Sequence, residues 1–417
     1  MLKPIPMDNS QLRINTGRLL ADFETLARIG ATSTGQISRP ALSLEDLEAR
    51  AWFADRIEDA GFAVRDDDAG NLSGIMYCTN PHARTMMIGS HLDTVPGGSR
   101  YDGSIGVLAG LEIMRTVQEA GIDLPFHLEV MDFTDEEGTW FSMLGSRGLT
   151  GGLPVGKLGD RRGEDAAFWA VLSRAGIDVN RVHLAKRDPT TLAGYLELHI
   201  EQGTILQRLN AQIGIVRGIV GRTTFQMTFV GEGGHSGTTD IYRRKDALQG
   251  AALFITRAHT LIHDRFDGSV INCGNLQVYP GMFNVIPERA TLTVECRNVE
   301  GEVLSALEHD LCTLASNCAA DCNVELTTER VEHLDAATMD ADMIAAVQQA
   351  CDDMQLKHSS MISYAGHDAQ PMSSFVPTGM VFIPTTAVEN DRKAHNATWP
   401  DVINGTNVLL QTVLNRA

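Results

Sequence analysis

Three apolar runs in the first half of the chain each end in a group of histidine and acidic residues. The runs are TMMIGSHLD at 85–93, FHLEVMDFTDEEG at 126–138 and GYLELHIEQG at 194–203. Between the first two lies SIGVLAGLEIMRTVQEAG at 104–121, a helical pattern that ends at a glycine. Short apolar runs that alternate with helical patterns predict an α/β fold, with the polar residues at the ends of its strands.

The pattern changes near residue 211. A β-rich segment at 213–237 is followed by a helical pattern at 244–265, strand patterns near 270–279 and 289–297, a helical pattern near 301–317 and a strand pattern near 322–330. This β-α-β-β-α-β order is close to the ferredoxin-like plan. Because 417 residues suit two domains, we predict a catalytic α/β domain of residues 1–211 and 331–417, interrupted by an inserted α+β domain of residues 212–330.

Net charge limits the classes of binding partner, and cysteine usage and hydropathy indicate the cell compartment. The net charge of −19 repels nucleic acid and anionic membranes, so we expect neither as a partner. The seven cysteines form no CxxC pair, which favours reduced thiols in a reducing compartment. No window of 18 apolar residues and no signal-peptide pattern is present, and we therefore expect a cytoplasmic protein.

The first apolar run supplies candidate metal ligands. His91 and Asp93 stand two positions apart in an extended segment, so their side chains point the same way. Asp93 can therefore fix the tautomer of a metal-bound His91 ring. Asp102 follows between turn residues just before the helical pattern, where a carboxylate can bridge two cations. Taken alone, Asp102 is equally a helix cap or a turn residue.

The second run ends in three consecutive acidic residues, among them Glu136 and Glu137. Adjacent carboxylates repel one another, and such a cluster is costly unless a cation or a proton lies between them. Taken alone, the cluster is a solvated acidic loop, and His199 and His395 are structural or surface histidines. Together these residues converge on one edge of an α/β sheet, where such folds place their sites. The mixed ligands suit zinc, manganese, nickel or cobalt, and a bridging Asp102 indicates a two-metal hydrolytic site.

Six motifs in the chain resemble those of one known family. They are GSHLDTVPGGSRYDGSIGVLAG, DFTDEEGTWF, ELHIEQG, GEGGHSGTT, NVIPERATLTVECRN and AGHDAQ. In this order, across roughly residues 15–417, they resemble the amidase, hydantoinase and carbamoylase group of two-metal zinc amidohydrolases. Members of that group include N-carbamoyl-L-amino-acid hydrolases, β-ureidopropionases and allantoate amidohydrolases. The resemblance implies a di-metal peptidase-like catalytic domain whose inserted ferredoxin-like domain acts as a lid and forms a homodimer.

The resemblance also implies two divalent metal ions per subunit, zinc or manganese, or nickel or cobalt. The implied ligands are His91, Asp102 and His199 for one ion and Asp102, Glu137 and His395 for the other. Glu136 resembles the general base that takes a proton from the attacking water. Asp93 resembles the residue that orients His91.

Further residues resemble the family's substrate contacts. His235 of the GGHSG motif resembles the residue that stabilises the oxyanion, and Arg297 resembles the residue that pairs with the substrate carboxylate. The implied polar groups and pocket wall are Gln202, Asn284 and Gly366. Simpler interpretations stay open: the GGHSG loop is also typical of a turn, and Arg297 of a salt bridge on a strand. His367 and Asp368 are equally suited to capping the next helix.

The implied activity is hydrolysis of a linear amide or ureido C–N bond in a small carboxylate substrate. Two departures from the family pattern affect the substrate: Ser99 replaces a usual glycine, and Ala394 precedes His395 in a charged loop. One alternative is a di-metal exopeptidase or N-acyl amino acid deacylase, but those relatives usually carry a carboxylate where His199 stands. A second alternative is a non-catalytic metal-binding homologue, which would have no need of Glu136.

Overall fold

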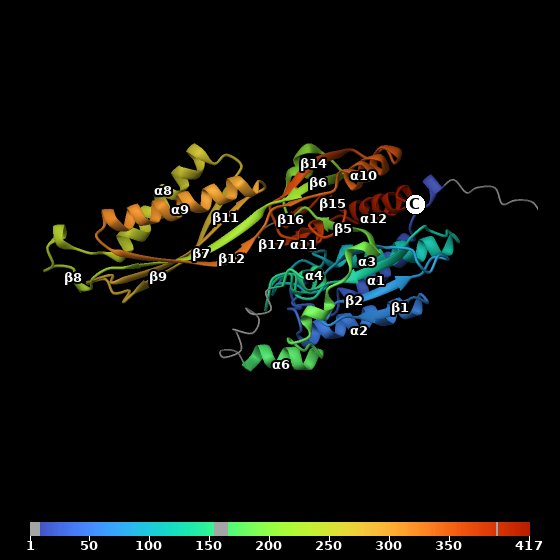
Figure 1. Ribbon diagram of the computed structural model, residues 1–417, viewed down its shortest axis with the longest axis horizontal. Coiled ribbons are helices and arrows are strands. Elements are labelled where there is room, and N and C mark those ends of the chain that lie inside the picture. Colours follow the sequence, from blue (N-terminus) through green and yellow to red (C-terminus); the bar gives the residue numbers. More distant parts are fainter. Residues whose placement is uncertain (1–8, 154–165, 389–390) are drawn as a thin grey trace, which may run out of the picture. The chain divides into compact units, whose positions relative to one another are not determined.

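The computed structural model describes residues 9–153, 166–388 and 391–417, with the backbone alone at 9, 387–388 and 391–395. These residues divide into two compact units (Figure 1). The first comprises Met1–Arg217 and Thr338–Ala417, and the second comprises Gly218–Ala337. The first unit is therefore interrupted in sequence by the second. Among the described helices, none combines the length and the hydropathy that a membrane span requires.

The first unit is built on a mixed sheet of nine described strands, in the order β1-β2-β4-β3-β5-β15-β6-β13 with β14 beside β6. The strands are β1 (Ala63–Asp66), β2 (Leu72–Met76), β3 (Thr85–Ser90), β4 (His127–Asp132), β5 (Leu192–Ile200), β6 (Ile213–Ile219), β13 (Ala337–Thr338), β14 (His358–Ser363) and β15 (Thr378–Ile383). At its centre β3 runs parallel to β4 and β5, and β15 runs parallel to β5. The carboxyl ends of these four strands therefore share one edge.

Helices pack on this sheet and bury its apolar strands. The described helices of the first unit are α1 (Thr16–Leu26), α2 (Leu44–Asp59), α3 (Ser104–Glu119), α4 (Leu144–Thr150), α6 (Ala166–Ala175), α7 (Ile205–Leu209), α10 (Ala341–Asp353), α11 (Ala369–Ser373) and α12 (Trp399–Asn415). The main core joins α1, α3, α10 and α12 to the central strands, while a smaller cluster forms around α4 and α6. The helical pattern at 104–121 becomes α3, which is buried over nearly its whole length and lies against β3 and β4. A hairpin of β16 (Thr386–Val388) and β17 (Asp391–Asn396) precedes α12.

The second unit is a four-stranded antiparallel sheet covered by two helices. Its strands are β7 (Gly221–Val230), β9 (Val270–Tyr279), β11 (Arg289–Asn298) and β12 (Glu325–Leu334), in the order β12-β7-β11-β9. The helices α8 (Ala247–Arg265) and α9 (Gly301–Asp321) pack their apolar faces on Phe225, Phe229 and Leu292 of the sheet. A short ribbon pairs β8 (Gly234–His235) with β10 (Val285–Ile286). The β-α-β-β-α-β order of the larger elements is the order that the sequence pattern predicts.

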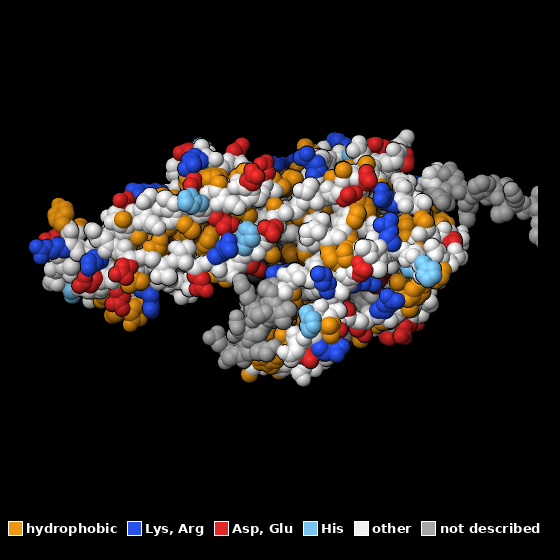
Figure 2. All heavy atoms as spheres, viewed as in Figure 1, with side chains coloured by type: hydrophobic (Ala, Val, Ile, Leu, Met, Phe, Trp, Pro, Cys, Tyr) orange, Lys and Arg blue, Asp and Glu red, His pale blue; other side chains and the backbone are white. Residues whose placement is uncertain are grey.

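The two chain crossings between the units lie later than the boundaries that we placed after residues 211 and 330. The β-rich segment at 213–237 is not one continuous part of the inserted unit, because its first strand, β6, pairs with β15 of the large sheet. At the other crossing β12 continues to Leu334, so the second unit ends at Ala337. Acidic and basic side chains are interspersed on the face that Figure 2 shows, despite the strongly negative total charge.

Candidate functional site

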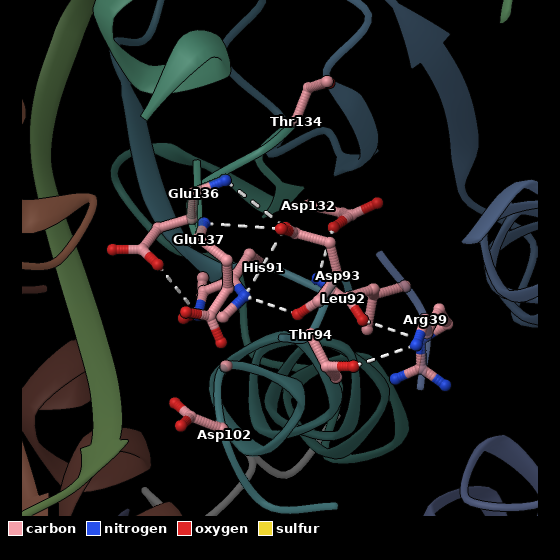
Figure 3. Close-up of polar contacts among 12 residues, drawn as sticks. Arg39, His91, Leu92, Asp93, Thr94, Asp102, Asp132, Thr134, Glu136 and Glu137 are labelled. Atoms are coloured by element: carbon pink, nitrogen blue, oxygen red, sulfur yellow. Dashed lines mark hydrogen bonds and ion pairs between the residues drawn. The ribbon is translucent and has the colours of Figure 1, made fainter. Parts of the chain in front are cut away.

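The carboxyl edge of the large sheet brings together residues that lie far apart in the sequence. His91 directly follows β3, Glu136 and Glu137 lie in the loop after β4, and His199 is the penultimate residue of β5. Figure 3 shows His91, both glutamates and Asp102 grouped beside the start of α3. The three apolar runs thus deliver their polar ends to one place, as their pattern predicts.

Asp102 joins the two histidines of this group. His199 Nε2 lies 3.0 Å from Asp102 Oδ1, and the ligand atoms of His91, Asp102 and His199 all lie within 4.8 Å of one another. Two imidazoles and a carboxylate at this spacing are a donor set that suits zinc and related divalent cations. Although its burial acts to raise the pKa of Asp102, the hydrogen bond from His199 holds that pKa well below its usual range.

Asp93 supports the group in two ways, but its hydrogen bond with His91 is made by the main chain rather than by the carboxylate that we expected. The Nδ1–H of His91 donates to the main-chain carbonyl of Asp93 at 2.9 Å, whereas the Asp93 carboxylate lies 3.6 Å from Nδ1. This contact leaves His91 Nε2 free to face the site, 3.5 Å from Glu136 Oε2. The Asp93 carboxylate instead accepts the main-chain N–H groups of Glu136 and Glu137, each at 3.3 Å. Asp93 therefore ties the loop after β4 to the loop after β3.

The acidic loop is held in a conformation that crowds its carboxylates. Asp135 adopts a left-handed backbone with φ of 54°, and its Oδ2 accepts the N–H groups of Trp140 and Phe141. Burial raises the pKa of Glu136 well above its ordinary value, against the opposing effect of His91. Burial and the nearby Asp102 raise the pKa of Glu137 to about 7. Buried, crowded carboxylates of this kind fit a site that receives positive charge from cations.

Gly103 is a site residue that our sequence interpretation missed. Its φ is 64°, and a Cβ at this position would lie 2.5 Å from Cε1 and Nε2 of the His91 ring. Its N–H also lies 3.3 Å from His199 Nε2. Only glycine permits this approach of the backbone to the His91 ring. The signal available in the sequence was its position directly after Asp102 and at the start of a helix.

Glu197 is a second missed residue, and it lies fully buried behind His199. Its carboxylate accepts hydrogen bonds from Ser90 Oγ at 3.0 Å, Tyr195 OH at 3.1 Å and the N–H of Ala369 at 2.8 Å. These contacts tie β3, β5 and α11 together at the site. The alternation of side chains along β5, which places Glu197 on the side of His199, was the signal that could have found it.

The Gly366-His367-Asp368 segment forms part of the same buried region. The His367 ring lies 4.4 Å from that of His199, and His367 Nε2 is 2.9 Å from Ser363 Oγ. Burial and the neighbouring His199 hold the pKa of His367 well below its ordinary value. Asp368 occupies the cap position of α11, but its side chain makes no capping hydrogen bond. The interpretation of these two residues as helix caps is therefore wrong for Asp368.

Gln202 and His395 complete the candidates of the first unit. Gln202 has φ of 57°, and its Nε2 donates to Asp102 Oδ2 at 2.8 Å, so it contacts the proposed bridging carboxylate. His395 lies in β17, where its backbone pairs with Ala387. The side chain of His395 is outside the described residues.

In the second unit the predicted substrate contacts fall into two separate places. His235 and Asn284 are neighbours, because β8 pairs with β10 and the N–H of Ser236 donates to Asn284 O at 3.0 Å. Arg297 lies near the opposite end of β11, beside Arg222 at the start of β7, and its Nε donates to Glu295 at 2.8 Å. Since strands rise about 3.3 Å per residue, most of the length of β11, about 26 Å, separates Arg297 from the ribbon end.

Comparison with known proteins gives the same assignment from several directions. Residues 87–415 match the family described as Peptidase family M20/M25/M40. An N-carbamoyl-L-amino acid amidohydrolase of Geobacillus stearothermophilus is 34% identical over 398 residues, which cover 95% of this chain and 97% of that protein. An allantoate deiminase of Arabidopsis thaliana is 29% identical, over 86% of this chain and 76% of that protein.

A solved structure extends this likeness to the fold. The amidase of the hydantoinase/carbamoylase family from Burkholderia multivorans superposes with a TM-score of 0.85 at 31% identity, over 97% of this chain and 98% of that chain. Similarity therefore runs through both units. This chain belongs to the Peptidase family M20/M25/M40 and, within it, to the amidases of the hydantoinase/carbamoylase family.

Proposed function

We propose that the protein hydrolyses a ureido C–N bond of a small carboxylate substrate, with N-carbamoyl-L-amino acids as its substrate class. The observation that carries the proposal is the buried His91–Asp102–His199 group with Glu136 beside it, in a chain similar over its length to an N-carbamoyl-L-amino acid amidohydrolase. Hydrolysis of such a substrate releases the free amino acid and a carbamate, which decomposes to ammonia and carbon dioxide.

The proposed cofactors are two divalent ions, zinc or manganese, or nickel or cobalt. His91, Asp102 and His199 would hold one, and Asp102, Glu137 and His395 the other. Ions bound there would polarise the ureido carbonyl and lower the pKa of the attacking water. The crowded carboxylates and the two imidazoles fit such ions, because both ligand types favour positive charge at the centre of the group.

The residues around the proposed metal ligands have separate roles in catalysis and in substrate binding. Glu136 would take a proton from the attacking water and return it to the leaving nitrogen, which is the role of a general base that becomes an acid. Asp93 holds the main chain of Glu136 in place, and Gly103 leaves room for the His91 ring. The Arg297 guanidinium would bind the substrate carboxylate, in competition with its present partner Glu295.

We also propose a homodimer in which each site is completed by the other subunit. One small substrate cannot touch both ends of β11, so Arg297 and the His235–Asn284 ribbon would act in different sites of the dimer. Two exposed aromatic side chains in the segments beside the ribbon support an interface with the second subunit there. Phe283 is 99% exposed and Tyr242 is 93% exposed. Large apolar side chains of this kind are typical of interfaces when they gather.

A substrate panel tests the proposed activity. The purified protein, reconstituted with manganese or with zinc, is assayed on N-carbamoyl-L-amino acids, allantoate and dipeptides. We expect ammonia release from the carbamoyl substrates and no cleavage of the dipeptides. Cleavage of dipeptides alone would replace this proposal by an exopeptidase. The seven free cysteines support the further proposal of a cytoplasmic location.

A further inference from the structure

A cavity of about 440 Å³ lies beside the candidate site in the first unit. Its walls come from the segment after β5, from the start of α7, from β14 with the loop after it, and from β15. All of these elements belong to the first unit, so the cavity does not depend on where the second unit lies.

The cavity wall is continuous with the proposed metal ligands. Gln202 lines the cavity, and its Nε2 donates to Asp102 Oδ2 at 2.8 Å. Phe382 also lines it, with its ring 6.4 Å from the ring of His199. The cavity therefore adjoins the proposed metal ligands, beside which the scissile carbon of a bound substrate would lie.

The described lining is largely apolar. Ile205, Met361, Ile362, Ala365 and Phe382 lie in the wall beside the polar Gln202, Ser363 and Tyr364, and none of the described wall residues is a lysine, arginine or histidine. The acidic residue of the described wall, Glu201, has both carboxylate oxygens engaged, since they accept the N–H groups of Ile205 and Leu206 at the start of α7. That carboxylate is thus satisfied inside the protein and is poorly placed to pair with a cationic ligand.

We propose that this cavity binds the side chain of the substrate and selects N-carbamoyl-L-amino acids with bulky apolar side chains. The inference rests on the proposed function. Such a substrate offers a carboxylate, a terminal carbamoyl nitrogen and a side chain. The carboxylate needs a cation, which the described part of the wall does not offer, and the terminal NH₂ is too small to fill the space. An apolar side chain, attached to the carbon next to the scissile nitrogen, matches both the largely apolar lining and the position of the cavity beside the proposed metal ligands.

Three substrates test this selection on the reconstituted enzyme. N-carbamoyl-L-methionine and N-carbamoyl-L-glutamine have side chains of equal length, and N-carbamoyl-L-alanine is the small reference. We expect kcat/KM for the methionine derivative to exceed that for each of the other two by about tenfold or more. Equal values for methionine and glutamine would overturn the proposal. Failure to hydrolyse any of the three would instead contradict the proposed function.

Two filling variants locate the effect. Ile205→Trp and Ala365→Leu add bulk from different walls, and we expect each to lower the methionine-to-alanine ratio of kcat/KM by about tenfold. Leu209→Trp is the matched control, because Leu209 lies on the same helix, is 46% exposed against 38% for Ile205, and is outside the cavity wall. An unchanged ratio in both filling variants, or the same loss in Leu209→Trp, would remove the cavity from substrate selection.

Discussion

The two units place functional residues in opposite ways, and the direction of their strands explains the difference. In the first unit, parallel β3, β4 and β5 end at one edge, so residues from three distant segments meet there. In the second unit, antiparallel β7 and β11 end at opposite edges, so the ribbon that follows β7 and Arg297 near the end of β11 lie apart. A parallel sheet assembles a site within one chain, whereas this antiparallel sheet divides its candidates between two places.

The largest expected effect concerns the carboxyl edge of the large sheet, which we call the assembled edge because His91, Glu136 and His199 meet there. Glu136→Gln keeps the size of the side chain but removes its basicity, so we expect kcat to fall by about 10²–10⁴-fold with metal content unchanged. Metal analysis of the purified variant alongside its turnover checks both parts. Turnover close to that of the unmodified enzyme would show that the assembled edge lacks the proposed base.

The next prediction tests how tightly that edge is packed. Gly103→Ala would place a Cβ 2.5 Å from the His91 ring, so we expect metal affinity to fall by about 10–100-fold. Gly121→Ala is a matched control, because Gly121 has φ of 65° against 64° but nothing within 4 Å of its Cβ position. Metal titration followed by calorimetry compares the two variants. Equal losses would mean that backbone strain, rather than contact with His91, accounts for the effect.

The second unit is tested at Arg297. Arg297→Ala removes the proposed partner of the substrate carboxylate, so we expect KM to rise by about 10–100-fold with a smaller change in kcat. Arg222→Ala serves as the control, since Arg222 is the cross-strand neighbour of Arg297, donates to Glu332 at 2.7 Å and lies 3.9 Å from Glu295, the partner of Arg297. Steady-state kinetics on one N-carbamoyl substrate would contradict the assignment if both variants raised KM alike.

The smallest expected effect is on the folding stability of the first unit, through the buried Asp46. Burial raises the pKa of Asp46 to about 7, against the opposing charge of Arg50, from an ordinary value of 3.8. The folded protein therefore holds a proton on Asp46 between about pH 4 and pH 7 that the unfolded chain releases. The stabilisation of the folded protein by the protonated Asp46 is therefore fully present below pH 4 and is lost as the pH rises to about 7. Asp46→Asn should accordingly raise the melting temperature more at pH 8 than at pH 5, and the reverse order would refute the assignment.

Much of the first site was predictable from the sequence, because it depends on local patterns. His91 and His199 stand at or beside the ends of apolar runs, and Asp102 precedes a helical pattern, so strand ends and one helix start were enough to group them. Gly103 and Glu197 were missed, since their contribution is a close approach and a buried hydrogen-bond network. Such features depend on how elements pack, which spacing along the chain does not reveal.

The arrangement of the candidate residues in the second unit was less predictable for a related reason. Motif resemblance assigned His235, Asn284 and Arg297 to one substrate, but the register of β11 against β7 separates them along the sheet. The boundary after residue 211 was misplaced because β6 and β7 are consecutive strands of similar composition, and only pairing shows that they belong to different sheets. Pairing and register are long-range properties that a single sequence specifies only weakly.

A mixed dimer tests most directly whether Glu136 of the first unit and His235 of the second unit act in sites of different subunits. Glu136→Gln and His235→Ala are each expected to be nearly inactive, the second through loss of an oxyanion donor worth about 10²–10³ in kcat. The two variants are co-expressed with different tags, and the dimer that carries both tags is isolated. If His235 serves the partner's site, one site of this dimer has every residue intact, and about half of the unmodified activity returns. A mixed dimer as inactive as its parents would show that Glu136 and His235 act in the same subunit and contradict the account.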